Sequence, residues 1–223
     1  MSAASGATPG SPSDPRTKPR VAVFGGSFNP PHVAHVMACV LVLSCYEIDD
    51  VLVVPAFQHP FAKSLAPFDD RVRMCELAMA WIPRVTVSRV EAEIGGEGKT
   101  LHTLEHLHAA HPDWELRLVM GADVLAESSK WFRFDRVRAL APPLVLGRAS
   151  ASGAALAGAA PGPSIAVAPA VLPALSSTEV RTRIAARAWG ELRELVPRGV
   201  LEYVQQRDLY AAGSPGGDGK APA

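Results

Sequence analysis

Short apolar runs alternate with segments of helical periodicity along most of this sequence, and this alternation constrains the fold more than any other feature. Short strands that alternate with helices are typical of βαβ units, in which helices cover both faces of a parallel sheet. We therefore predict an α/β fold with a Rossmann-like parallel sheet. The predicted strands and short apolar runs are 21–24, 51–54, 85–90, 116–120, 144–146 and 165–167, and the predicted helices are 33–46, 69–81, 100–110, 124–128, 134–140, 178–188 and 200–206.

The two ends of the chain differ in composition from the segment between them. Residues 1–19 and 212–223 are rich in Ser, Ala, Gly and Pro, which is typical of disordered tails. Residues 149–164 are rich in Ala and Gly and interrupt the alternation, and we interpret them as a flexible, low-complexity surface excursion. The prediction is a single domain over residues 20–211.

Charge and hydropathy exclude several classes of protein. The 22 Lys and Arg residues balance the 22 Asp and Glu residues, so no overall field favours nucleic acid or an anionic membrane. The longest apolar run, Val36–Leu43, is far shorter than the roughly 20 residues that a membrane span needs. The first residues lack the apolar segment of a secretory signal, and the cysteines form no CxxC pair. We expect buried reduced thiols in a cytoplasmic protein that binds neither nucleic acid nor membrane, while the oligomeric state stays open.

The segment after the first predicted strand carries the strongest chemical signal. Gly25 and Gly26 allow a tight turn and let a ligand approach the backbone closely. Ser27 and the amides that follow can donate to phosphate oxygens. His32 and His35 are three residues apart at the start of a predicted helix, so they share a face. A helix N-terminus attracts anions, and the sequence therefore predicts a phosphate site here.

Two motifs resemble those of a known enzyme superfamily. Residues 25–35, GGSFNPPHVAH, resemble the HxGH nucleotide-binding motif of the nucleotidyltransferases, with Ala34 where glycine is usual. Residues 175–181, LSSTEVR, resemble the ISSTxIR signature of the same superfamily. The similarity is greatest to the bacterial nicotinate-nucleotide adenylyltransferases and extends over most of residues 21–210. It implies a domain of the nucleotidyltransferase type.

The resemblance implies an ATP site where the two motifs meet. Residues that act directly on the reacting phosphates would be His32, His35, Lys63 and Arg181. The full set that would bind ATP is Gly25, Gly26, Ser27, Phe28, His32, His35, Ser176, Ser177, Thr178 and Arg181. The resemblance also implies Mg²⁺, bound through the phosphates of ATP and not by a metal site of the protein.

The resemblance further implies that nicotinate mononucleotide accepts the adenylyl group, giving deamido-NAD and pyrophosphate. The acceptor would be bound by Thr100, Leu101, Asp123 and Trp131, with an aromatic ring against the pyridine. The Pro-rich segment 55–63 departs from the family pattern, so nicotinamide mononucleotide and phosphopantetheine stay open as alternative acceptors. The alternatives from other classes are a nucleotide-binding protein without catalysis and, from the HxxEH pattern of residues 102–106, a zinc peptidase.

Other segments of the sequence match, in full or in part, motifs of unrelated sites. Residues 102–106, HTLEH, match the HxxEH motif of zinc peptidases, and we interpret them as the polar face of an amphipathic helix. Residues 93–100 resemble a P-loop, but Glu stands at the first glycine, and we interpret them as a loop over the acceptor site. Arg71, on the second predicted helix, is a further candidate for a phosphate contact. The remaining tryptophans, Trp81, Trp114 and Trp189, we interpret as packing residues.

Overall fold

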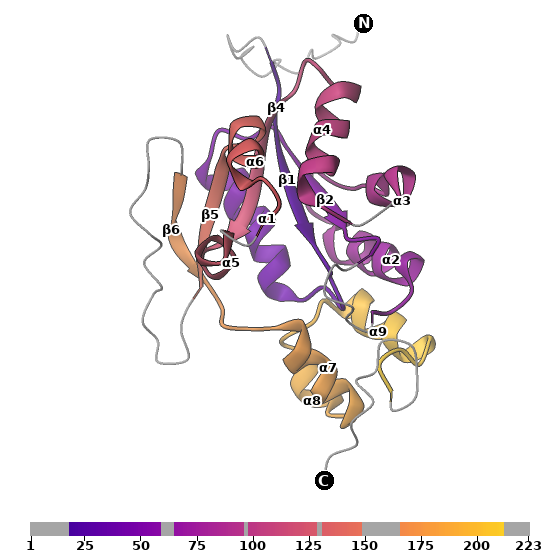
Figure 1. The fold of residues 1–223 in the computed structure, drawn as a ribbon. Coiled ribbons are helices and arrows are strands. Elements are labelled where there is room, and N and C mark those ends of the chain that lie inside the picture. The colour runs from indigo at the N-terminus through magenta and orange to yellow at the C-terminus, as the bar shows by residue number, and fades with distance from the viewer. Residues whose placement is uncertain (1–17, 59–64, 96–97, 129–130, 149–165, 212–223) are drawn as a thin grey trace, which may run out of the picture.

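A single parallel sheet forms the centre of the molecule. The structure, a computed structural model, describes residues 18–58, 65–95, 98–128, 131–148 and 166–211. In these residues six parallel strands lie in the order β3-β2-β1-β4-β5-β6 (Figure 1). The prediction of a Rossmann-like parallel sheet is confirmed. The strands are β1 (Arg20–Gly26), β2 (Asp50–Pro55), β3 (Val85–Val87), β4 (Glu115–Gly121), β5 (Pro143–Arg148) and β6 (Ala166–Leu172).

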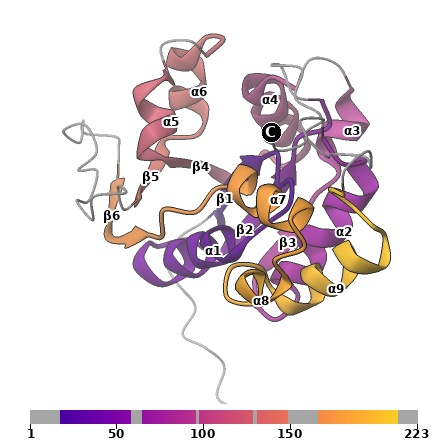
Figure 2. The same ribbon diagram turned by 90° about the horizontal axis from the view of Figure 1, so that it is seen from below.

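Helices cover both faces of the sheet because alternate strand residues point to opposite sides. Val21 and Val23 of β1 belong to one apolar core with α3, α4 and α6, whereas Ala22 belongs to the other with α1, α2, α7 and α9. Figure 2 shows α4 and α6 on the opposite side of the sheet from α1 and α8. The helices are α1 (Val33–Cys45), α2 (Phe68–Met79), α3 (Val90–Ile94), α4 (Thr100–Ala110), α5 (Ala122–Ala126), α6 (Phe134–Leu140), α7 (Ser177–Ala185), α8 (Trp189–Leu192) and α9 (Arg198–Gln206).

The strand order determines where a ligand can bind. β1 pairs with β2 on one side and with β4 on the other. From β1, successive strands are added outward in one direction as β2 and β3 and in the opposite direction as β4, β5 and β6, so β1 and β4 flank the switch point of the sheet. In open parallel sheets, ligands bind beyond the carboxyl ends of the strands at such a switch point. The segments after Gly26 of β1 and after Gly121 of β4 therefore border the expected crevice.

One predicted strand is partly wrong. Residues 85–90 are predicted as a strand, but β3 ends at Val87 and α3 begins at Val90. The Ser88 hydroxyl accepts a hydrogen bond from the Val90 N–H (3.2 Å), and Glu91 and Glu93 lie in the first turn. The Ser88 bond forms a turn just before the N-cap residue Arg89, and the two acidic residues of the first turn favour a helix start there.

Two predictions of burial are also wrong. Trp81 is 65% exposed, because it follows the last turn of α2 and the next residue, Ile82, occupies the apolar position instead. Cys45 ends α1 and is exposed, whereas Cys39 and Cys75 are buried reduced thiols as predicted. Trp114 and Trp189 pack against the two cores, in agreement with the sequence. Within the part of the chain that the structure describes, no helix is long and apolar enough to cross a membrane.

Apart from Lys18 and Pro19, the predicted tails and the excursion over 149–164 lie outside the described residues. Lys18 donates to the Pro112 carbonyl (3.0 Å), and the Pro19 carbonyl accepts from the Glu115 N–H (2.9 Å). We expect that removal of residues 1–17 and 213–223 leaves the melting temperature and the activity nearly unchanged, because these compositions bury little apolar surface. Thermal unfolding of the truncated chain tests this, and a drop of many degrees would show that the domain limits are wrong.

Candidate active site

The segment that joins β1 to α1, residues 27–32, is held in a compact form and is called the β1–α1 loop below. Phe28 has a left-handed backbone (φ 44°), and its ring is buried against Phe24, with the centroids 5.4 Å apart. A Cβ on Gly26 would lie 3.2 Å from the Phe28 ring, so glycine is favoured there. A Cβ on Gly25 would meet nothing within 4 Å. The backbone at Gly25 is therefore open to a ligand, as the sequence predicts.

The two predicted histidines lie together at the start of α1. His32 is buried at the N-cap position, and the stacked ring of His35 lies 3.8 Å away from its ring, centroid to centroid. The His32 backbone N–H donates to Nδ1 of His35 (3.1 Å). Because Nδ1 accepts this bond, the proton of a neutral His35 imidazole is on Nε2. His35 is thus oriented by the backbone with its Nε2–H as a defined donor.

The second motif lies directly against the β1–α1 loop, although the two are far apart in sequence. Arg181 of α7 donates to the Asn29 carbonyl (2.9 Å), and Ser177 donates to the Pro30 carbonyl (2.9 Å). Ser176 caps α7 by accepting from the Glu179 N–H (3.1 Å). Thr178, on the first turn, accepts from the Arg181 guanidinium (3.3 Å). The structure therefore brings the two predicted phosphate-binding motifs together.

Arg71 supports the same loop from inside the protein. Its side chain is buried, and it donates to the carbonyls of Ser27 and Ala66, each at 3.0 Å. Burial lowers the pKa of the guanidinium from its usual value. Since both bonds go to the backbone of the protein, we assign Arg71 to loop support and not to the phosphate contact that the sequence suggested.

Two of the predicted acceptor residues lie on α4, which covers the opposite face of the sheet from α1 and α7. Thr100 begins α4, and the N–H groups of His102 and Thr103 donate to the Lys99 carbonyl, at 2.9 and 3.4 Å. The N–H groups of Thr100 and Leu101 precede these and so lie outside the helical ladder. The Leu101 side chain itself is buried in the core, so only its backbone can face a ligand.

The other two predicted acceptor residues follow β4. Asp123 is exposed in the first turn of α5, and a Cβ on Gly121 would collide with its carboxylate. Trp131 is half-buried, with its ring 5.9 Å from that of Phe134, so part of its surface packs on the core. The next residue, Phe132, is 50% exposed. Lys63 lies outside the described residues.

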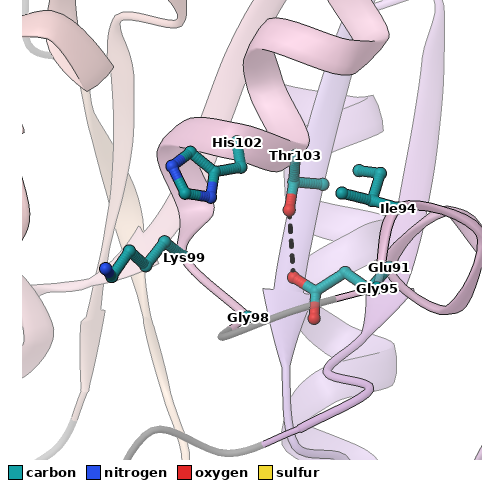
Figure 3. Close-up of a pocket in the computed structure, with 7 residues that line it drawn as sticks. All are labelled: Glu91, Ile94, Gly95, Gly98, Lys99, His102 and Thr103. Atoms are coloured by element: carbon teal, nitrogen blue, oxygen red, sulfur yellow. Dashed lines mark hydrogen bonds between the residues drawn. The ribbon is translucent and has the colours of Figure 1, made fainter.

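A small pocket between α3 and α4 contains a side chain that the sequence analysis did not select (Figure 3). The pocket is lined by Glu91, Ile94, Gly95, Gly98, Lys99, His102 and Thr103. Glu91 accepts hydrogen bonds from the Thr103 hydroxyl (3.1 Å) and from the Phe57 N–H after β2 (3.0 Å). Burial raises the pKa of this carboxyl. Glu91 thus connects the segment after β2 to the first turns of α4.

Lys99 and Phe132 form a second contact between these acceptor elements. The Lys99 ammonium lies 4.8 Å from the centroid of the Phe132 ring, which is within the range of a cation–π interaction. The His102 ring approaches the same phenyl ring edge-on, with the centroids 6.0 Å apart. The only sequence signal for this contact is the position of Phe132 beside Trp131.

The HxxEH pattern and the P-loop-like segment do not form the structures that a zinc peptidase and a P-loop need. His102 and His106 are exposed on α4 while Leu101, Leu104 and Leu107 are buried, as predicted for an amphipathic helix. Among the described residues no group of three or more His, Cys, Asp or Glu could hold a metal ion. Glu93 lies inside α3, so a P-loop directly after a strand is not formed.

The Glu91 contacts lead to a prediction about stability. Glu91→Ala leaves the buried Thr103 hydroxyl without its acceptor, and we expect the free energy of unfolding to fall by about 1–3 kcal/mol. In Glu91→Gln the amide oxygen can accept from the Phe57 N–H and the NH₂ group can donate to the Thr103 hydroxyl. Because burial raises the folded-state pKa of Glu91, its ionisation lowers the free energy of unfolding at neutral pH. This loss of stability disappears as the pH falls toward the usual pKa of a carboxyl group, where the side chain is protonated.

The Glu91→Gln variant should therefore be at least as stable as the wild type at pH 7, with a difference that shrinks on acidification. Urea unfolding of both variants at several pH values measures these effects. Equal losses for Ala and Gln would show that the two hydrogen bonds are not what Glu91 contributes.

The described geometry defines a nucleotide-binding α/β domain, because imidazoles, hydroxyls and a guanidinium meet beside a parallel sheet at its switch point. A model of the cytidylyltransferase-like family matches residues 23–183. A protein of Anaeromyxobacter sp. (strain K) is 48% identical over 193 residues, which cover 85% of this chain and 96% of that protein. A protein of Myxococcus xanthus is 37% identical over 196 residues, which cover 86% of this chain and 94% of that protein.

Both proteins carry the name "Probable nicotinate-nucleotide adenylyltransferase". The chain belongs to the cytidylyltransferase-like family and, within it, to the nicotinate-nucleotide adenylyltransferases. Among solved structures, the Plasmodium falciparum nicotinic acid mononucleotide adenylyltransferase complexed with NaAD matches with a TM-score of 0.70 and 16% identity. The match covers 86% of this chain and 97% of that chain, and at this identity it concerns the fold alone.

Proposed function

We propose that this protein transfers the adenylyl group of ATP to nicotinate mononucleotide, giving deamido-NAD and pyrophosphate in NAD biosynthesis. The observation that supports it best is the contact of α7 with the β1–α1 loop, through Ser177 and Arg181, beside the stacked histidines. Relatives named nicotinate-nucleotide adenylyltransferase support the choice of reaction.

In the proposed reaction the 5′-phosphate of the acceptor attacks the α-phosphorus of ATP in line, and pyrophosphate leaves. The enzyme needs no nucleophile of its own, so catalysis consists of positioning and charge stabilisation. His32 and His35 would contact the reacting phosphate, and the backbone from Gly25 to Phe28 would lie along the nucleotide. Nε2–H of His35 is suited to this because the His32 backbone holds the ring through Nδ1.

The β- and γ-phosphates would be bound at the start of α7. Ser176, Ser177 and Thr178 place hydroxyl groups at a helix N-terminus, and Arg181 adds a positive charge one turn later. Arg181 donates to the loop through Nη1 and to Thr178 through Nη2, so a phosphate that also binds this guanidinium would tie the two motifs together. In this scheme Lys63 assists between the donor and the acceptor.

The acceptor would bind between the start of α4 and the segment after β4. The N–H groups of Thr100 and Leu101 would donate to the carboxylate of nicotinate, and Trp131 would lie against the pyridine ring. Asp123 would bind another polar part of the mononucleotide. Glu91 supports the first of these elements through Thr103 (Figure 3).

Mg²⁺ fits this site only as part of the substrate. The groups around the β1–α1 loop are imidazoles, hydroxyls and a guanidinium, whereas Mg²⁺ prefers carboxylate and phosphate oxygens. The ion would therefore be carried by the phosphates of ATP and would offset their negative charge. The residues of this chain would hold the phosphate oxygens that the ion leaves available.

A panel of acceptors tests the proposal. Release of pyrophosphate from ATP and Mg²⁺ is expected with nicotinate mononucleotide and should be slower with its amide or with phosphopantetheine. Release with phosphopantetheine alone would identify a different adenylyltransferase. Binding of ATP without release with any of the three would indicate the non-catalytic alternative.

A further inference from the structure

We propose that Tyr210, which follows α9, is a positioning residue for the β1–α1 loop. Its hydroxyl orients Asn29, and Asn29 fixes the loop backbone that leads to His32 and His35. The position of the loop is a property of the free protein. The expected consequence for ATP rests on the proposed function.

The β1–α1 loop needs support from outside its own residues. Phe28 adopts a left-handed backbone that is disfavoured for a bulky side chain. The hydrogen bonds that hold the loop come from other elements, namely from Arg71 of α2 to the Ser27 carbonyl and from Ser177 of α7 to the Pro30 carbonyl. The position of the loop therefore depends on elements that arrive from distant parts of the sequence.

Asn29, between Phe28 and Pro30, accepts hydrogen bonds from three other segments of the chain. Its side chain is only 2% exposed, and its Oδ1 accepts from the Ala66 N–H (2.9 Å) and from the Tyr210 hydroxyl (3.0 Å). Its backbone carbonyl accepts from Arg181. One buried residue thus connects the loop to the segment before α2, to α7 and to the end of the described chain.

The direction of the Tyr210 hydrogen bond follows from its neighbours. A backbone N–H can only donate, so the Asn29 atom that faces Ala66 is the oxygen and not the amide nitrogen. The Tyr210 hydroxyl faces the same oxygen and must donate to it. Burial raises the pKa of Tyr210 above its usual value, so the phenol keeps its proton.

Tyr203 provides a matched control on the same C-terminal segment. Its hydroxyl donates to the carboxylate of Asp70 on α2 (2.7 Å) and not to a residue of the β1–α1 loop. Tyr203→Phe and Tyr210→Phe each remove one hydroxyl group and keep the aromatic ring. Both variants lose a hydrogen bond that stabilises the fold, but only Tyr210→Phe loses a bond to the β1–α1 loop.

The experiment measures amide hydrogen exchange and ATP kinetics in the wild type and both variants. In Tyr210→Phe we expect faster exchange of the amides of residues 27–29 and 32–33, and a fall of about 2- to 10-fold in kcat/KM for ATP. The KM for the acceptor should stay the same within about twofold. Tyr203→Phe should lower the melting temperature at least as much without either change, because its partner carries a charge.

The inference would be overturned if the amide hydrogen exchange rates of the β1–α1 loop were unchanged in Tyr210→Phe. It would also be overturned if Tyr203→Phe raised these rates equally. Equal changes in the KM for ATP and for the acceptor would also overturn it, since a general loss of structure predicts that result. The exchange measurement needs no substrate. If the wild type transfers no adenylyl group, the proposed function fails, and loop exchange still decides whether Tyr210 positions the loop.

Discussion

Replacement of His35 by Ala is expected to reduce turnover by on the order of 10²–10³-fold while ATP binding weakens far less. The reason is that a donor aimed at charge that develops at the α-phosphorus stabilises the transition state more than the bound substrate. The geometry supports this role because the His32 N–H fixes Nδ1 of His35 and so leaves the proton on Nε2. Single-turnover rates together with an equilibrium measurement of ATP binding separate the two effects.

The Ala variant also removes the acceptor of the His32 N–H, and a second variant controls for that loss. Gln at the third helical position can accept a hydrogen bond from the N-cap backbone, so His35→Gln keeps the helix start without the imidazole. We expect His35→Gln to be nearly as slow as His35→Ala but to melt closer to the wild type. His106→Ala, at an exposed position of α4, should be silent. Equal losses in binding and rate for His35→Gln would show that the ring acts in the ground state.

Local sequence patterns predicted most of the sheet and the first of the two motifs, and the second motif was found by its resemblance to the family signature. The strands are short buried runs whose period and composition differ from those of the helices, and the glycines and histidines of the first motif are adjacent in sequence. The spatial meeting of the two motifs was implied by the family resemblance alone. The hydrogen bonds from Ser177 and Arg181 now give a physical account of that meeting.

The supporting residues could not be found in the same way, because their partners are distant in sequence and follow no period. Tyr210 and Asn29 are separated by 181 positions. Glu91 lies between the predicted strand 85–90 and the predicted helix 100–110, so its acidic side chain was no signal for a site until α3 placed it against Thr103. In the sequence, Arg71 is a positive charge near the expected phosphate site and is therefore a candidate ligand. Its burial, which assigns it to loop support instead, is visible only in the packed structure.

The choice between the acid and amide forms of the acceptor is the second prediction with a large effect. The two forms differ only by a carboxylate or a carboxamide on the ring. The N–H groups of Thr100 and Leu101 lie at the start of α4, where the helix dipole also favours negative charge. These groups are donors, so the NH₂ of the amide would lose its hydrogen bonds to water without replacement, at a cost of about 1–3 kcal/mol. We therefore expect kcat/KM to favour the acid form by about ten- to a hundredfold or more.

A pair of substitutions at Thr100 tests whether the backbone donors cause this preference. Proline is tolerated at the first helical position and has no N–H, so Thr100→Pro removes one donor while α4 can still begin there. Thr100→Ala removes the same side chain and keeps the N–H. The acid-to-amide ratio of kcat/KM, measured at saturating ATP, should fall several-fold in Thr100→Pro and stay near the wild-type value in Thr100→Ala.

Trp131→Ala should lower kcat/KM for both acceptors without reversing the order of preference, because stacking does not distinguish the acid from the amide. A wild-type ratio near one, or one that favours the amide, would reject nicotinate mononucleotide as the preferred acceptor and leave adenylyl transfer itself intact.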